Sequence, residues 1–409
     1  MHYAQKTTGC SLVVLPGWCV YLLFVLALAV GFWQGRRSSA VRYTDTNASA
    51  IDKHYFKGLN HLLNEQPDAA IETFIEALEV NSETLETHLA LGNLLRRRGE
   101  TDRAIRIHQN LLARPSLPIQ QSHQVQYELA IDFIKAGLFD RAEGLLKELV
   151  ATDGNYRSQG LQRLLEIYRD EKEWEQGLAI ISELSGSRFS KNYDRWADIK
   201  AHFHCELAEE YMLSTNYLTA RQQLKYALAA DKKSVRASLL LGKLEISAGH
   251  YRKGISQLQK ITSQNRQFFP EALPILFAGY EQLNDIKGYR QFLMSLPDEY
   301  LSDALLIAVA DIIEQDEGQA AAAQYIASEV LKKPSAGGLY RLLEFYIELS
   351  QGRTQEHLQS LKTVMSAIID HRAHYMCQDC GFKGKQLHWL CPSCKTWGSI
   401  EPIKTTNCE

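Results

Sequence analysis

The stretch HLALGNLLRRRGETDRAIRIHQNL, residues 88–111, decides the fold of this chain. Its apolar residues recur at the three- and four-residue spacing of amphipathic helices, and Gly99 interrupts them in the middle. A glycine in the left-handed conformation ends a helix and lets the chain turn back. The stretch therefore predicts two antiparallel helices joined by a tight turn at Gly99.

The helical pattern repeats along the chain at a spacing of 34 residues. Small or apolar residues mark two positions in each unit, twelve residues apart, because paired helices approach closely only where side chains are small. The first position is occupied by Gly58, Gly92, Ala130, Leu165, Ala208 and Gly242. The second is occupied by Ala70, Ala104, Ala142, Gly177, Ala220 and Gly254.

This spacing resembles the tetratricopeptide repeat. The resemblance covers residues 51–268 in six units, and degenerate helix pairs follow over 271–296, 301–333 and 337–370. It implies an all-α fold, a right-handed superhelix of about nine helix pairs over residues 51–370 in which each pair packs against its neighbours. Arrays of this kind bind peptides or partner domains, and nothing in the repeat is catalytic by itself.

The inner surface of such an array is lined by the first helix of each pair. The resemblance therefore places seven residues toward a partner, namely Asn93, Arg96, Arg97, Glu166, Arg169, Glu209 and Lys243. Their charges are mixed and include no matched set of Lys and Asn for a C-terminal carboxylate, which disfavours a receptor for chaperone tails. The alternative for each residue is an ordinary solvated surface group.

Two clusters of polar residues in the array suggest further sites. Arg96–Arg98, with Arg103 and Arg106, can meet an acidic partner or anionic lipid, although a solvated helix end is the favoured interpretation. His202, His204 and Cys205 are spaced so that they do not share one helical face, which disfavours a metal site. Because acids and bases alternate without an aromatic stacking platform, we expect no nucleic acid partner.

The overall composition is that of a soluble globular protein. The 409 residues carry 45 Lys and Arg against 48 Asp and Glu, and 45% of them are hydrophobic. These averages exclude a disordered chain, a polytopic membrane protein and a polyanion binder recognisable by its overall charge. The averages hide three segments of different composition: an apolar N-terminus, a mixed-charge array and a cysteine-rich tail.

An uncharged run, LVVLPGWCVYLLFVLALAVGFW, extends over the 22 residues 12–33. A helix of that length spans a hydrocarbon core of about 30 Å. Residues 1–35 are therefore predicted to be a transmembrane anchor, followed by a linker over 36–50. The alternative is a cleaved signal peptide that ends near Ala29. Arg36 and Arg37 favour the anchor and place the rest of the chain on the cytoplasmic side.

Four of the eight cysteines lie close together near the C-terminus. Cys377, Cys380, Cys391 and Cys394 form the pattern C-x2-C-x10-C-x2-C. The two-residue spacer lets both sulfurs of a pair reach one ion. Gly381 permits the turn after the first pair, and Lys395 takes the place of this glycine after the second pair. Four thiolates suit one Zn2+ or iron ion in tetrahedral geometry.

The residues around these cysteines, 371–409, are too few to form a hydrophobic core of their own. We therefore expect the metal to supply much of the folding free energy, with Tyr375, Phe382, Trp389 and Trp397 covering the thiolates. A redox dithiol would need only one C-x-x-C pair, and disulfides are disfavoured in a cytoplasmic domain. The segment resembles rubredoxin-type metal domains and zinc ribbons.

The order of these parts on one chain resembles the lipopolysaccharide assembly protein B family of Gram-negative bacteria. The resemblance extends to the stretches GLFDRAEGLL (137–146), HFHCELA (202–208), ADIIE (310–314) and CPSCKTWGSIEPI (391–403). It implies a non-enzymatic adaptor of the inner membrane that acts with the membrane-anchored protease FtsH. The adaptor controls turnover of the deacetylase that commits UDP-acyl-glucosamine to lipid A, and gathers other lipopolysaccharide synthesis and transport proteins.

Two other functions are compatible with the sequence. One is a membrane-tethered rubredoxin that passes electrons to an oxidoreductase docked on the repeats, which would require iron in the cysteine site. The other is a general repeat scaffold for envelope machinery. The sequence has no Ser/His/Asp set, phosphate-binding glycine loop or His-Glu metalloprotease motif, so we expect no hydrolase activity and classify the chain as a non-enzyme.

Overall fold

A computed structural model describes residues 85–403 apart from 116, 153, 187–195, 298–299, 301 and 371. It also describes Trp18, residues 25–33 and scattered positions between 56 and 73. The chain divides into two compact units, residues 1–115 and 116–409.

The first unit contains the helical hairpin that residues 88–111 predict. Helix α4 (Leu85–Arg97) and helix α5 (Thr101–Leu112) pack against each other, and Gly99 between them has a φ of +87°. Gly92 on α4 is buried against the ring of His108 on α5, and a Cβ at this position would overlap that ring. The small residue and the turn glycine therefore have the roles that the repeat pattern assigns to them.

The predicted N-terminal anchor lies largely outside the described residues. Residues 25–33 are helical, as is Trp18, and their apolar side chains are exposed. Residues 12–17 and 19–24 of the predicted span are not among the described positions. Within the part of the chain that the structure describes, no helix combines the length and the apolar character needed to cross a membrane.

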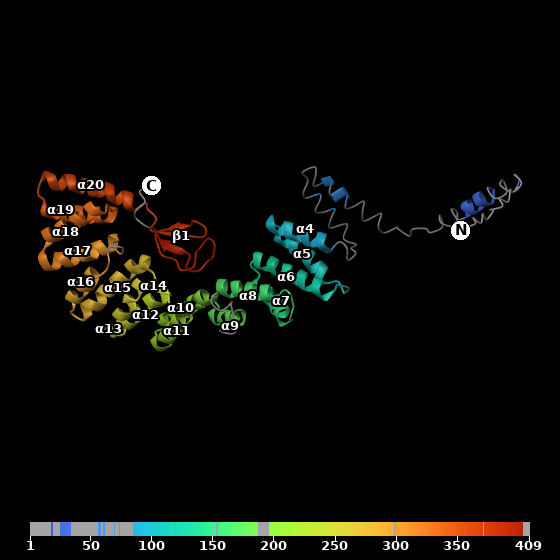
Figure 1. Ribbon diagram of the computed structural model, residues 1–409, viewed down its shortest axis with the longest axis horizontal. Coiled ribbons are helices and arrows are strands. Elements are labelled where there is room, and N and C mark those ends of the chain that lie inside the picture. The colour runs from blue at the N-terminus through green and yellow to red at the C-terminus, as the bar shows by residue number, and fades with distance from the viewer. Residues whose placement is uncertain are drawn as a thin grey trace, which may run out of the picture. The chain divides into compact units, whose positions relative to one another are not determined.

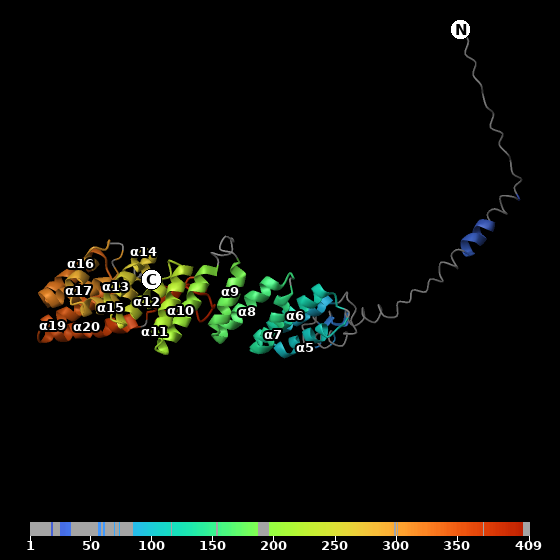
Figure 2. The same ribbon diagram turned by 90° about the horizontal axis from the view of Figure 1, so that it is seen from below.

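The second unit consists of further helical hairpins, which follow one another in an arc in Figure 1 and appear edge-on as a row in Figure 2. The first helices of neighbouring pairs also pack together, as α10 does with α12 and α17 does with α19. The helices are α6 (Ile119–Lys135), α7 (Phe139–Ala151), α8 (Arg157–Glu171), α9 (Trp174–Ser185), α10 (Ala197–Leu213), α11 (Tyr217–Ala230), α12 (Val235–Ser247), α13 (Tyr251–Gln259), α14 (Ile261–Gln264), the short 3-10 helix η3 (Arg266–Phe268), α15 (Phe269–Gln282), α16 (Ile286–Met294), α17 (Asp303–Glu317), α18 (Gln319–Lys332), α19 (Ala336–Leu349) and α20 (Arg353–Asp370).

The weakly patterned C-terminal part of the array also forms helix pairs. One core connects α12 to α19 and includes Phe269, Val309, Ile326 and Phe345. Serine caps start two of the helices, since the side chain of Ser302 accepts from the N–H of Leu305 and that of Ser335 accepts from the N–H of Gly338. The prediction of a mostly helical repeat array is confirmed.

Small residues hold the paired helices of the second unit close together. Ala208 and Ala220 are fully buried, and a Cβ on Gly242 would overlap the side chain of Leu258 on the facing helix. These positions are the ones that the 34-residue repeat marks. Their burial shows that the repeat reflects close helix contact rather than composition.

We expect Gly242→Ala to destabilise the array by about 1–3 kcal/mol, because the added methyl group forces α12 and α13 apart. Gly144→Ala on α7 is the matched control, since nothing lies within 4 Å of its Cβ position. This control is expected to stabilise the chain by about 0.5–1 kcal/mol through its helix propensity. Chemical denaturation followed by circular dichroism measures both, and equal stability of the two variants would contradict the close packing.

The cysteine-rich segment forms a small antiparallel sheet. Its strands are β1 (Tyr375–Cys377), β2 (Lys383–Gly384) and β3 (Ile400–Pro402), in the order β2-β1-β3. Tyr375 pairs with Gly384 on one side and with Pro402 on the other. We call residues 374–403 the metal module. In Figure 1 it lies on the inner side of the arc that α8 to α20 describe.

Candidate metal centre and its docking site

Two tight turns position the four cysteines. In the first turn the N–H of Gly381 donates to the carbonyl of Cys377 at 3.0 Å, and in the second the N–H of Lys395 donates to the carbonyl of Cys391 at 3.0 Å. Both turn residues are left-handed, with φ of +75° at Gly381 and +59° at Lys395. Such a conformation costs a non-glycine residue about 1–2 kcal/mol, so Lys395 is held there by its surroundings.

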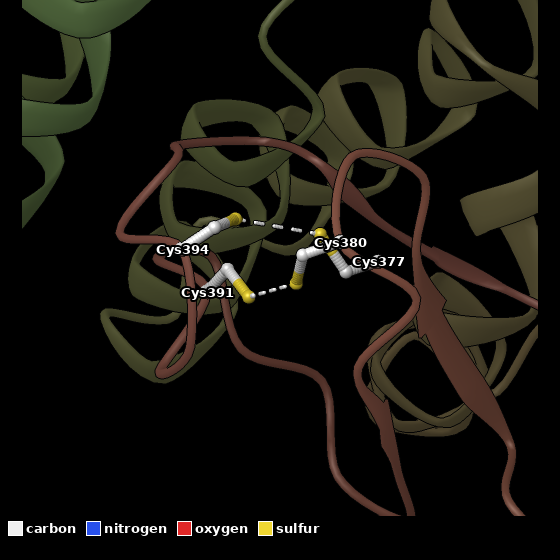
Figure 3. Close-up of side chains that lie close together, drawn as sticks. All are labelled: Cys377, Cys380, Cys391 and Cys394. Atoms are coloured by element: carbon white, nitrogen blue, oxygen red, sulfur yellow. Dashed lines mark hydrogen bonds between the residues drawn. The ribbon is translucent and has the colours of Figure 1, made fainter. Parts of the chain in front are cut away.

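The four sulfur atoms surround one point (Figure 3). The Sγ atoms of Cys377 and Cys394 lie 3.7 Å apart, as do those of Cys380 and Cys391, and all four are within 4.8 Å of one another. Sulfurs bound to one tetrahedral ion at about 2.3 Å lie about 3.8 Å apart. All four cysteines are free thiols. They therefore form a site for one metal ion.

Hydrogen bonds favour the thiolate form at two of the ligands. The hydroxyl of Ser399, 3.3 Å from the Sγ of Cys377, lowers the pKa of that thiol to about 6. The hydroxyl of Thr396 likewise lowers the pKa of Cys394, whereas burial raises the pKa of Cys391 to about 11. Thiolates are soft ligands, and four of them in a tetrahedron suit zinc or iron. Such an ion would be held by these residues and would stabilise the folded module.

Apolar side chains cover the cysteines on one side. Cys377 and Cys391 are buried with Ile400, and Tyr375, Phe382 and Leu387 pack against them. Trp389 and Trp397, which the sequence analysis also expected over the thiolates, pack against the repeats instead. A small module cannot bury two indole rings by itself, so these rings gain more apolar contact against the array.

Trp397 is the centre of the contact between the metal module and the array. Its side chain is only 8% exposed and lies in a core that includes Trp174 and Phe203. The ring stacks on His202 of α10, with centroids 4.9 Å apart and an interplanar angle of 17°. The guanidinium of Arg236 on α12 lies 5.8 Å from the indole centroid, within range of a cation–π contact. Trp397 therefore anchors the second cysteine turn to the repeats.

Further contacts extend this docking site along the first helices of the array. Trp389 stacks on Phe268 with centroids 5.5 Å apart. The hydroxyl of Tyr375 donates to Glu271 on α15, and the Nη1 of Arg169 on α8 donates to the carbonyl of Lys395 at 3.3 Å. The metal module thus rests on α8, α10, α12 and α15, in the middle of the array.

Arg236 is a buried cation beneath the module. Its side chain is 4% exposed, and its Nη2 donates to Glu206 and Glu209, each at 2.8 Å. Burying an ion pair is costly unless each charge keeps a partner. The two carboxylates on α10 supply the partners and connect α12 to the helix that carries His202. Sequence reasoning missed this cluster, since no local pattern distinguishes Arg236 from a surface arginine.

The predicted partner residues have different surroundings. Glu166 and Arg169 line a cavity of about 250 Å³ together with Lys395–Trp397, so these two face the metal module, whereas Glu209 pairs with Arg236 on α12. In the first unit, Arg96 donates to Asn93 at 2.6 Å and Arg97 is exposed. Lys243 is exposed on α12. Binding of another protein by these residues remains a prediction.

His202, His204 and Cys205 belong to the core of the array. Burial lowers the pKa of His202 to about 3, which keeps its ring neutral against Trp397, and raises the pKa of the Cys205 thiol to about 12. His204 contacts Gln223 through its Nδ1 at 2.7 Å. Among the described residues, the cluster of possible metal ligands consists of the four cysteines of the module.

A helical repeat array that holds a four-cysteine ribbon on its first helices defines the protein as a metal-binding repeat scaffold. Residues 375–402 match the rubredoxin metal binding domain model, and residues 57–116 match the tetratricopeptide repeat model. The chain is 36% identical over 386 residues to lipopolysaccharide assembly protein B of Escherichia coli, covering 94% of this chain and 98% of that protein. Identity to lipopolysaccharide assembly protein B of Haemophilus influenzae is 33% over 393 residues, with the same coverage. The chain belongs to the lipopolysaccharide assembly protein B family.

Among solved structures, the array resembles the Naa15/Naa10 complex bound to HypK. The TM-score is 0.42 at 13% identity, covering 78% of this chain and 46% of that one. The family assignment rests on the sequence relatives and not on this likeness.

Proposed function

We propose that the protein is an inner-membrane adaptor that couples the protease FtsH to turnover of the UDP-acyl-N-acetylglucosamine deacetylase of lipid A synthesis. The observation that carries the proposal is the 36% identity, over nearly the whole chain, to a protein named for lipopolysaccharide assembly. The assembly role follows from that relationship, and the protease and the deacetylase are the partners that membership of the family implies. Other lipopolysaccharide synthesis and transport proteins would be gathered by the same array.

The architecture suits an adaptor. The first helices of the array expose charged side chains, such as that of Lys243, which can contact a protein partner. The metal module is part of the folded array through Trp397 and Arg169. We infer that the metal ion bound by the four cysteines stabilises a binding surface and takes no part in a reaction.

A membrane anchor at the N-terminus completes the proposal. Residues 25–33 form an apolar helical stretch whose large side chains are exposed, among them Leu28, Phe32 and Trp33. Arg36 and Arg37 follow at once and favour a cytoplasmic array. Confining the array to a thin layer under the membrane raises its effective concentration for membrane-bound partners.

Depletion of the protein in its native cells tests the proposal. We expect the deacetylase level and the lipopolysaccharide output to rise together, because the protease loses the adaptor that delivers its substrate. Immunoblotting of the deacetylase and quantification of lipopolysaccharide measure the two effects. Re-expression from a plasmid is the control and should lower both. A constant deacetylase level after depletion would exclude the adaptor function.

A further inference from the structure

Residues of α15, α16, α17 and α19 line a cavity of about 560 Å³ on the array. Its floor is apolar, with Leu273, Tyr289 and Ile312 each at most 4% exposed. Phe277 and Ile307 are half-buried in its wall, and Ala304 and Gln315 are exposed at its edge. A cavity of this size accommodates one or two large apolar side chains of a ligand.

The helices that line this cavity carry more acids than bases. Helices α15, α16, α17 and α19 carry nine carboxylates and three cations, Lys287, Arg290 and Arg341, whereas the whole chain carries 48 acids and 45 bases. Asp311, Glu314 and Arg341 line the cavity themselves.

Three cations on the helices around the cavity already pair with carboxylates. The guanidinium of Arg341 donates to Asp311 at 2.8 Å, to Glu314 at 2.9 Å and to Glu344 at 3.0 Å. Lys362 of α20 pairs with Glu344 at 3.0 Å, and Arg290 of α16 pairs with Asp316 and Glu317. The three carboxylates of Asp311, Glu314 and Glu344 thus share two cations, Arg341 and Lys362. One negative charge at the rim is left unbalanced.

A proline adds an acceptor to the same wall. Pro274 lies inside α15, so the carbonyl of Pro270 receives no helical hydrogen bond from residue 274. Both prolines line the cavity. The wall therefore offers two carboxylates and one backbone carbonyl beside an apolar floor, and these groups accept hydrogen bonds from cations.

We propose that this cavity binds an extended peptide segment in which a bulky apolar side chain is flanked by lysines or arginines. The apolar side chain enters over Leu273 and Ile312, and the flanking cations meet Asp311 and Glu314. Segments of this composition are common at the cytoplasmic ends of transmembrane helices. A membrane protein beside the array is the source we assign, and this assignment rests on the proposed inner-membrane location.

The test is fluorescence anisotropy of a labelled peptide with the full-length chain in an uncharged detergent. The probe carries a Leu-Leu pair with a Lys-Lys pair on each side. One comparison peptide has glutamate in place of every lysine, and a second has serine in place of both leucines. We expect the first peptide alone to bind, with an affinity that falls as salt is added, because rim charges are screened by ions.

Two variants at exposed positions locate the site without disturbing the core. Ala304→Phe fills the mouth of the cavity and is expected to weaken binding about tenfold. Gln315→Lys adds a positive charge at the rim and is expected to weaken it about fivefold. Ala367→Phe and Gln359→Lys make the same changes at exposed positions of α20 and should leave the affinity unchanged.

The proposal is overturned if Ala304→Phe binds the peptide as tightly as the unaltered chain. It is also overturned if the glutamate or serine peptide binds as well as the lysine–leucine peptide, since charge and cavity are both required. Because the measurement involves neither the protease nor the deacetylase, its failure removes this binding site and leaves the depletion test of the adaptor function unaffected.

Discussion

Replacing Cys391 by serine is expected to unfold the metal module and release it from the array, with the helices of the array retained. Cys391 is fully buried, its Sγ lies 3.7 Å from that of Cys380, and it belongs to the small core of the module. Zinc binding to small domains supplies about 10–16 kcal/mol of apparent free energy. A module of this size has no other interaction that supplies so much folding free energy, so loss of one ligand is expected to unfold it.

Three measurements follow this change. Elemental analysis should show one metal ion per chain in the unaltered protein and almost none in Cys391→Ser. Tryptophan emission should shift to longer wavelength, because two of the six tryptophans, Trp389 and Trp397, lose their buried surroundings. The far-ultraviolet circular dichroism of the helices should change little.

Ser393→Ala is the control for the metal prediction, since Ser393 is exposed in the same turn and is not a ligand. It should keep the metal and the emission spectrum. A Cys391→Ser chain with full metal content would show that the four sulfurs are not the binding site. Elemental analysis of the unaltered chain also separates the functional hypotheses, because zinc has no redox chemistry and its presence excludes the electron carrier.

Trp397→Ala is expected to detach the module from the array while the metal ion is retained. The indole is 8% exposed between His202, Phe203 and Arg236, and none of the metal ligands depends on it. Truncating a buried tryptophan to alanine costs about 3–5 kcal/mol. This free energy is lost from the contact between the module and the array, which only a few other side chains stabilise.

Hydrogen exchange measures the detachment. Backbone amides of α10 and α12 beneath Trp397 should exchange faster in Trp397→Ala, whereas metal content should stay at one ion per chain. His388→Ala is the control, because this ring lies in the same module but is exposed. Unchanged exchange in α10 would show that Trp397 does not hold the module in place. Loss of metal would show that docking and metal binding are one event.

The metal site and the repeats were accessible to sequence reasoning because both are local patterns. A C-x2-C turn brings its two sulfurs together whatever surrounds it, and small residues at 34-residue spacing report helix contact within one pair. Gly242 and Gly381 therefore have the surroundings that their positions predict. Lys395 is the exception, since it adopts at the second cysteine turn the left-handed conformation that a glycine adopts at the first.

The predictions of the N-terminal anchor and of the partner surface had different outcomes from those of the metal site and the repeats. The span over 12–33 extends beyond the described residues, and it remains a prediction. Glu166, Arg169 and Glu209 lie on first helices as expected. The neighbour that Glu166 and Arg169 meet is the chain's own metal module, and Glu209 pairs with Arg236 on α12. A helical period identifies which face a residue occupies and does not identify what covers that face.

By itself, the sequence determined the helical pairs, their small contact residues and the four ligands of one metal ion, because each depends on residues that are close along the chain. Only the tertiary structure decided where the metal module rests. The bond from Arg169 to Lys395 joins residues 226 positions apart, and that from Tyr375 to Glu271 joins residues 104 apart. Contacts at such separations depend on the curvature of the whole array, which sums small rotations between many helix pairs and leaves no periodic signal in the sequence.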